Sequence, residues 1–183
     1  MSRWSTKVAL LGIVAVVTVP PSAASSWSSD ATRDRNCRAS QLTVHAGRWA
    51  LGTTHTGGYI AFTNQSHNSC RLTGWPTLAG ETAAGATTVA RHVRSTWFGP
   101  YVKGVPVLTL RHAQTAEAAF SGSDRPEHGS TTCSPAFRHL RVTPPGNSRS
   151  VLLSAWFPPL GRYLPGCAPL QVSMVVSPSA FSH

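Results

Sequence analysis

Acidic side chains are scarce in this sequence: six Asp and Glu residues stand against sixteen Lys and Arg residues, and the formal net charge is +10. A glycosidase needs two carboxylates that flank the scissile bond, and a calcium site needs several oxygen ligands. Asp124 and Glu127 are close in sequence, but Arg125 between them is typical of a solvated loop. Asp30 and Asp34 fall in a polar N-terminal stretch. The sequence therefore favours neither kind of site.

Closely spaced metal ligands are also missing. Zinc sites use pairs such as C-x-x-C, whereas the nearest cysteines here are 33 and 34 positions apart. The eight histidines never fall two, three or four positions apart. A blue-copper site would need a histidine near Cys167 and Met174, and only the terminal His183 follows them. We expect no metal and no cofactor, although histidines that are distant in sequence can still converge in the fold.

Long helical patterns are absent, because fourteen prolines and fifteen glycines interrupt almost every window that could hold three helical turns. The nearest match to the nucleophile pattern G-x-S-x-G is GNSRS from Gly146, which lacks the last glycine. It follows a Pro-Pro dipeptide, which predicts a turn between strands. We therefore assign no catalytic residue, and Ser148 is expected to be a turn serine.

The sequence has a single long apolar run, Val8 to Val17, preceded by Arg3 and Lys7 and followed by small residues. This pattern is typical of a signal peptide, and the run is shorter than the roughly 20 residues that span a bilayer. We expect a signal peptide over residues 1–24, a flexible segment over 25–36 and one domain over 37–183. An uncleaved anchor is the alternative. The mature chain is expected to be secreted and to have no membrane span.

Four cysteines behind a signal peptide predict two disulfides, because exported proteins fold in oxidising compartments. Four cysteines allow three pairings. Cys37 precedes the first expected strand and Cys70 opens the third, while Cys133 and Cys167 each precede a later strand. We expect the bonds Cys37–Cys70 and Cys133–Cys167, each of which would tie neighbouring elements together.

Short segments of alternating apolar and polar residues, separated by turn-forming residues, predict an all-β fold. Two polar stretches are each expected to close a hairpin. They are NQSHNS (64–69) and His112 to Gln114. Seven to nine strands at this spacing favour an immunoglobulin-like antiparallel β-sandwich. The segments expected as strands are 41–46, 58–64, 69–75, 87–93, 105–110, 116–120, 139–143, 151–156 and 170–176.

The order of these features resembles the domain of unknown function 4232 family, found in secreted proteins and lipoproteins of actinobacteria. In that family a strand ending in Thr-Asn is followed by a small polar loop and then by Cys, Leu, Gly, an aromatic residue and Pro. Here those positions are Cys70, Leu72, Gly74, Trp75 and Pro76. The resemblance runs from about residue 37 to residue 178. It implies an extracellular β-sandwich and no assigned activity.

Two positions depart from the pattern of that family. Trp75 stands where a tyrosine is more usual, and His112-Ala113 stands where a Pro-Gly turn is common. The second departure leaves the geometry of that turn open.

Arginines are spread along the chain, and the only local grouping with aromatic residues is Arg91 and Arg94 with Trp97 and Tyr101. Nucleic-acid binding would need a clustered basic surface, so no nucleic acid is expected. These four residues are our candidate ligand site within residues 81–104, a solvated face being the alternative. We predict a non-enzymatic domain that binds an anionic cell-envelope polymer or another envelope protein. The alternative is an extracellular hydrolase whose site is assembled from distant His and Asp or Glu residues.

Overall fold

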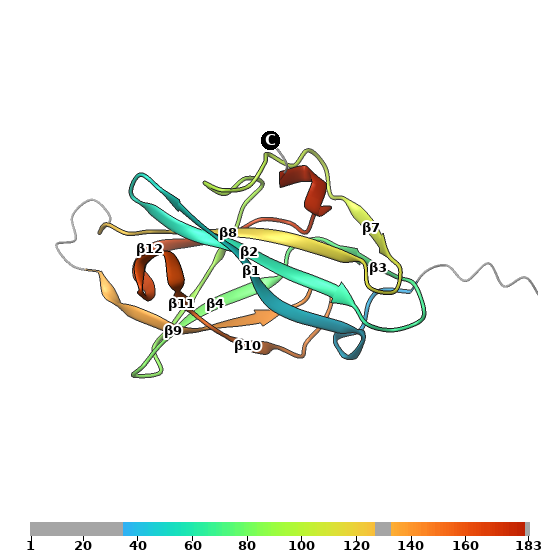
Figure 1. Cartoon of the computed structure of the whole chain (residues 1–183), viewed down its shortest axis with the longest axis horizontal. Helices are drawn as coiled ribbons and strands as arrows, with labels where there is room; N and C mark the ends of the chain where they lie inside the picture. The colour runs from blue at the N-terminus through green and yellow to red at the C-terminus, as the bar shows by residue number, and fades with distance from the viewer. Residues whose placement is uncertain (1–34, 127–132, 182–183) are drawn as a thin grey trace, which may run out of the picture. The chain divides into compact units, whose positions relative to one another are not determined.

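Strands and their connections make up the computed structural model, which describes residues 35–126 and 133–181 (Figure 1). The all-β prediction is confirmed. Of the twelve strands described, β5, β6 and β11 have three residues or fewer, which leaves nine longer ones. The strands are β1 (Leu42–Gly52), β2 (His55–Asn64), β3 (Cys70–Thr73), β4 (Thr77–Thr82), β5 (Thr87–Val89), β6 (Arg91–His92), β7 (Val107–Leu110), β8 (Thr115–Ser123), β9 (Ser134–Thr143), β10 (Val151–Ser154), β11 (Trp156–Phe157) and β12 (Arg162–Val172). Short 3-10 helices are η1 (Ala39–Gln41), η2 (Pro158–Leu160) and η3 (Pro178–Phe181).

The expected signal peptide over residues 1–24 lies outside the described residues, as does most of the 25–36 segment. Asn36, at the end of that segment, forms a parallel bridge with Arg71 of β3. Within the described part of the chain, no helix is long and apolar enough to cross a membrane.

One continuous hydrogen-bonded path runs through the strands in the order β1-β2-β8-β12-β9-β4-β5. Strand β10 lies off this path and also pairs with β9. Strand β12 belongs to both halves of this path. Residues 167–172 pair with β8, whereas residues 164–166 pair with β9. In Figure 1, β1, β2 and β8 run beside one another, and β4, β9 and β10 form the second group. An immunoglobulin sandwich has two separate sheets, so the shared β12 leaves that topology unconfirmed.

The core lies between these two groups because alternate residues of each strand face inward. The predicted inward residues Val44, Ile60 and Phe62 are buried. From the other group, Phe137 and Leu140 are also buried. Burying side chains of this size contributes about 1.5–3 kcal/mol each, so the strand pattern is strongly specified.

Both predicted disulfides are present. Cys37 bonds to Cys70, with 4.8 Å between their Cα atoms, and Cys133 bonds to Cys167, with 4.6 Å. In the chain-entropy model, each closed loop of this length stabilises the fold by about 3–4 kcal/mol. Both bonds together are comparable to the net stability of a typical domain, which is about 5–15 kcal/mol.

Both predicted hairpins are wrong. Strand β2 pairs with β1 and β8, whereas β3 pairs with β7 in a separate two-stranded ribbon. Strand β7 in turn does not continue into a hairpin with β8. The chain therefore crosses from β2 to this ribbon after Asn64, and crosses from the ribbon to β8 before Thr115. Polar turn-forming residues fit a crossing of this kind as well as they fit a hairpin, so the local pattern could not separate the two.

Several strand boundaries also differ from the sequence-based expectation, which contained no strand at the position of β4. The expected strand 87–93 splits at Ala90, because β5 pairs with β4 whereas β6 pairs in parallel with β12. The expected last strand 170–176 is the end of the longer β12, which stops at Val172. Beyond it, Val176 forms an isolated bridge with Glu117 of β8.

The segment after β6 is ordered by specific contacts with the outer side of β2 and β8. Tyr59 of β2 donates its hydroxyl hydrogen bond to the carbonyl of Phe98 at 2.9 Å. Val102 is buried in a small second cluster with Met174 and Val176. The segment after β6 therefore packs against the first group of strands.

Candidate functional site

The chain crosses from β2 to the β3–β7 ribbon at residues 65–69 and from the ribbon to β8 at residues 111–114. These two crossings meet at Asn64, the last residue of β2, which is fully buried. Its side-chain amide donates hydrogen bonds to the carbonyls of Asn68 and Leu110, both at 2.9 Å. Its side-chain oxygen accepts from the backbone N–H and the hydroxyl of Ser66, at 2.9 and 2.8 Å. A buried Asn can rarely satisfy all these groups unless the surroundings are built for it. Asn64 therefore fixes the 65–69 loop against the end of β7.

The backbone of Asn64 also holds the second crossing. Its N–H donates to the carbonyl of Gln114 at 3.0 Å, and its carbonyl accepts from the N–H of Ala113 at 2.7 Å. Ala113 has a φ of 61°, in the left-handed region that favours glycine. The turn whose geometry the sequence left open therefore contains an alanine in the left-handed conformation.

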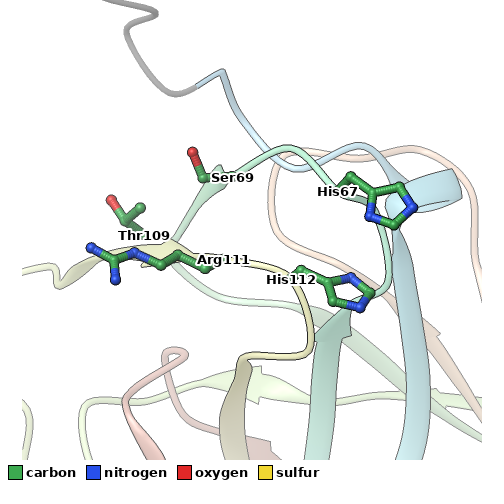
Figure 2. Close-up of a pocket in the computed structure, with 5 residues that line it drawn as sticks. All are labelled: His67, Ser69, Thr109, Arg111 and His112. Atoms are coloured by element: carbon green, nitrogen blue, oxygen red, sulfur yellow. The ribbon is translucent and has the colours of Figure 1, made fainter.

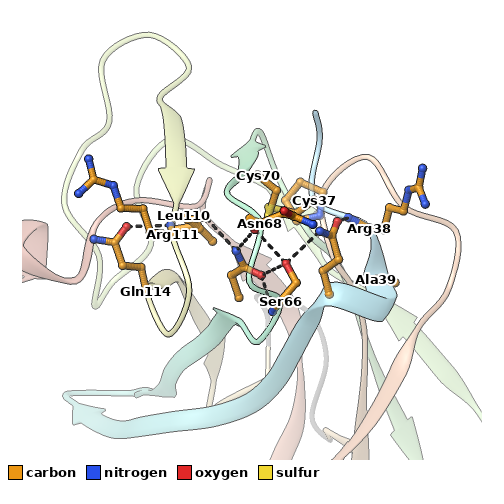
Figure 3. Close-up of a disulfide and its surroundings, with 12 residues drawn as sticks. Cys37, Arg38, Ala39, Ser66, Asn68, Cys70, Leu110, Arg111 and Gln114 are labelled. Carbon is orange, nitrogen blue, oxygen red and sulfur yellow. Dashed lines mark hydrogen bonds between the residues drawn. A yellow bond between two sulfur atoms is a disulfide. The ribbon is translucent and has the colours of Figure 1, made fainter. Parts of the chain in front are cut away.

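The Cys37–Cys70 disulfide supports the same region from the other side (Figure 3). Cys70 pairs with Leu110 across the β3–β7 ribbon, and both residues are buried. The carbonyl of Cys37 accepts a hydrogen bond from the side-chain amide of Asn147 at 3.0 Å. The ribbon is thus tied to the start of the domain by a covalent bond and to the main sheet by Asn64.

These constraints place an open surface pocket of about 510 Å³ between the two crossings (Figure 2). All of its lining residues are exposed. They are His67, Ser69, Thr109, Arg111 and His112.

The pocket has two chemically different ends. The imidazole rings of His67 and His112 face each other, with 5.2 Å between their centroids and 25° between their planes. Figure 2 shows the Arg111 side chain extending away from these rings, along the ribbon towards Thr109 and below Ser69. One end therefore offers two imidazoles, and the other offers a guanidinium and two hydroxyls.

No carboxylate is among the lining residues of this pocket. In the described chain, the side chain of Arg111 forms no ion pair; the one ion pair found there joins Arg141 to Glu81 on the β4–β9 sheet. The hydrogen bond that Arg141 donates to the Glu81 carboxylate, together with the negative charge of that carboxylate, raises the pKa of Arg141. Glu117 and Asp124 lie on or just after β8. The pocket therefore presents positive charge without an internal counter-charge from the residues described.

The residues predicted from the sequence as a ligand site have different surroundings in the structure. Arg91 is exposed on β6, where it pairs with Gln171 of β12. Arg94 donates from its guanidinium to the carbonyls of Val102 and Gly104 in its own loop, at 3.4 and 3.2 Å.

Trp97 and Tyr101 are 58% and 70% exposed. The indole of Trp97 stacks on His55 at the β1–β2 turn, with 4.2 Å between ring centroids and 2° between planes. It also lies over Gly52, where an added Cβ would come within 2.4 Å of the indole nitrogen. The structure thus uses Arg94 and Trp97 in intramolecular contacts, while Arg91 and Tyr101 remain open to solvent.

Histidines that are distant in sequence do converge in the fold. Among the described residues there is no group of three His, Cys, Asp or Glu side chains that could hold a metal ion. His92 stacks on Trp75 and reaches the carbonyl of Pro76 at 3.1 Å. His67 and His112, by contrast, meet in the open pocket although they are 45 positions apart.

Sequence reasoning missed this pocket because it assigned the two polar stretches to two separate hairpins. The usable signal was the composition of both stretches. NQSHNS and RHAQ each carry a histidine, and the second begins with an arginine directly after an apolar strand. Pairing β3 with β7 is the step that brings them together, and that pairing has no local signature.

The sequence from residue 37 to residue 178 matches the family described as a domain of unknown function, DUF4232. No curated protein and no solved structure matches the chain.

Proposed function

We propose that this chain, which belongs to the DUF4232 family, is a non-enzymatic module that binds an anionic ligand in the pocket between its two chain crossings. The ligand carries phosphate, sulfate or carboxylate groups. The two disulfides fit an oxidising compartment, and secretion to the cell envelope is part of the proposal.

The observation that carries the proposal is the position of Arg111. Its guanidinium is directed towards Thr109, and none of the described pocket residues is acidic. A guanidinium can donate two parallel hydrogen bonds to an oxyanion, and charge-assisted bonds of this kind are about twice as strong as neutral ones. The guanidinium itself has no acceptor atom and therefore cannot ligate a cation.

Solvent access determines how this binding should behave. All five lining residues are exposed, so the attraction acts in a medium of high dielectric constant and is screened by salt over about 8–10 Å. We expect modest affinity for a single anionic group and a steep loss of affinity as the salt concentration rises.

Salt elution from a phosphate-bearing resin tests the proposal with three variants of equal net charge. Arg111→Gln removes the pocket guanidinium, Arg91→Gln removes the cation of the segment predicted from the sequence, and Arg162→Gln removes an exposed arginine at the start of β12. We expect Arg111→Gln to elute at a clearly lower salt concentration than the other two. Equal elution of all three would show that net charge alone causes retention and would overturn the proposal. Earliest elution of Arg91→Gln would move the site to β6.

A hydrolase is the second candidate, and the observation that favours it is the convergence of His67 and His112 in a pocket that Ser69 also lines. His112 places its Nδ1 3.2 Å from the carbonyl of Ser66. A carbonyl that accepts from Nδ1 would orient the ring, as a carboxylate does in a catalytic triad. Turnover of generic ester, glycoside or peptide substrates that is abolished by His112→Asn would establish this function and overturn the non-enzymatic proposal.

A further inference from the structure

The outer face of the β3–β7 ribbon continues the positive charge of the pocket. The strands pair in the register Cys70 to Leu110, Arg71 to Thr109, and Leu72 to Leu108. Cys70, Leu72 and Leu110 are buried, so the alternate residues face solvent. Arg71 therefore stands directly opposite Thr109, which lines the pocket.

Arg71 and Arg111 are diagonal neighbours on this face, since Arg111 follows the partner of Arg71 by two residues. Diagonal pairs of this kind place their Cβ atoms about 7–8 Å apart at most. Both side chains are exposed. Figure 2 shows the Arg111 guanidinium directed along β7 towards Thr109, which is the direction of Arg71.

A third arginine flanks the same ribbon. The carbonyl of Arg35 accepts a hydrogen bond from the backbone N–H of Arg71 at 2.9 Å, beside the bridge between Asn36 and Arg71. None of the carboxylates that the structure describes lies on β3 or β7. From the imidazoles of His67 and His112 to Arg71, the surface therefore offers cationic and hydrogen-bonding groups in a line rather than around a point.

A single small anion would use one end of this line and leave the other groups unused. We infer that the ligand is a linear polyanion, which lies along the outer face of the ribbon and places successive anionic groups at the pocket and at Arg71. This inference rests on the proposed function and specifies its ligand class. Successive charges on one chain bind cooperatively, because the second contact forms at a high effective concentration.

Binding measurements with inorganic phosphate and with linear polyphosphate of increasing length test the inference. We expect affinity per phosphate group to rise at least tenfold from phosphate to a chain of about ten groups. Arg71→Gln should remove most of this gain and lower the slope of log K against log salt concentration by about one. Arg162→Gln, which removes the same charge elsewhere, should retain the gain. Polygalacturonate tested beside polyphosphate distinguishes carboxylate from phosphate as the repeated group.

The outcomes separate this inference from the proposed function. If phosphate binds through Arg111 but longer chains bind no tighter per group, the pocket is an anion site and the polymer inference is wrong. An equal loss in Arg71→Gln and Arg162→Gln would also overturn it, because general charge would then explain the gain. If neither probe binds in an Arg111-dependent manner, the proposed function fails as well.

Discussion

Replacing Asn64 with alanine should lower the free energy of unfolding more than an alanine substitution at any position of the 65–69 loop. The substitution removes four side-chain hydrogen bonds, two of which the amide donates to main-chain carbonyls. A typical bond contributes about 0.5–1.5 kcal/mol, and a buried group left without a partner costs about 1–3 kcal/mol. The bond to Leu110 is buried, whereas Ser66 lies at a partly exposed position where water can replace Asn64. We therefore expect a loss of about 3 kcal/mol.

Urea denaturation followed by tryptophan fluorescence measures this loss, with Asn68→Ala as the matched control. Asn68 lies in the same loop with an exposed side chain, and only its backbone carbonyl contacts Asn64. Its replacement should change the free energy of unfolding by no more than about 0.5 kcal/mol. Equal effects of the two substitutions would refute the assignment of Asn64 as the residue that joins the crossings.

Asn64→Asp adds a pH dependence whose direction can be worked out. The new carboxyl would be buried and would face two carbonyl oxygens, so its folded-state pKa should lie above its unfolded value of about 3.9. A carboxyl whose pKa is higher in the folded state than in the unfolded state destabilises the fold least at pH values below its unfolded-state pKa. The difference in stability from the wild type should therefore be smallest below about pH 4 and should grow as the pH rises towards the folded-state pKa. A constant difference between pH 3 and pH 7 would contradict burial of this side chain.

Three further sets of substitutions test the disulfides, the packing of the core and the left-handed turn. Replacing either disulfide pair with serines, at 37 and 70 or at 133 and 167, should lower the free energy of unfolding by about 3–4 kcal/mol in denaturation assays, because the closed loops are of nearly equal length. In phosphate-binding assays only the loss of Cys37–Cys70 should weaken binding, because this bond anchors the ribbon that carries the pocket. Gly80→Ala should destabilise by about 1–3 kcal/mol by overpacking, because its Cβ would come within 2.6 Å of the buried Phe137 ring; Gly122→Ala, with no contact closer than 3.7 Å, is its control in thermal melts. Ala113→Gly should gain about 0.5–1 kcal/mol in urea denaturation, because relief of about 1–2 kcal/mol of left-handed strain exceeds the entropy lost with the more flexible unfolded chain.

The strand faces and the disulfides could be predicted from the sequence because each is encoded locally. Alternation at Ile60 and Phe62 identifies the inner face of β2, and both residues are fully buried. The positions of Cys37 and Cys70 before and at the start of strands limited their pairing. Both kinds of signal require only the spacing of residues along one segment.

The pocket could not be predicted, because it depends on which strands pair rather than on where strands lie. A crossing and a hairpin both require polar turn-forming residues, and Asn64 and Gln114 satisfy either. The pairing of β3 with β7 is decided by burial of Leu72 and Leu110 at a distance of nearly forty positions. Arg94 and Trp97, which are prominent in the sequence, both make intramolecular contacts, Arg94 within its own loop and Trp97 with His55.

Chemical-shift mapping during a titration with inorganic phosphate tests the central claim most directly. We expect backbone and imidazole signals of residues 65–69 and 109–114 to move together, with one saturation curve. The same titration of Arg111→Gln should leave these signals unmoved at equal phosphate concentration. Movement centred on residues 91–101, or spread over all exposed arginines in proportion to charge, would contradict an anion site between the two crossings.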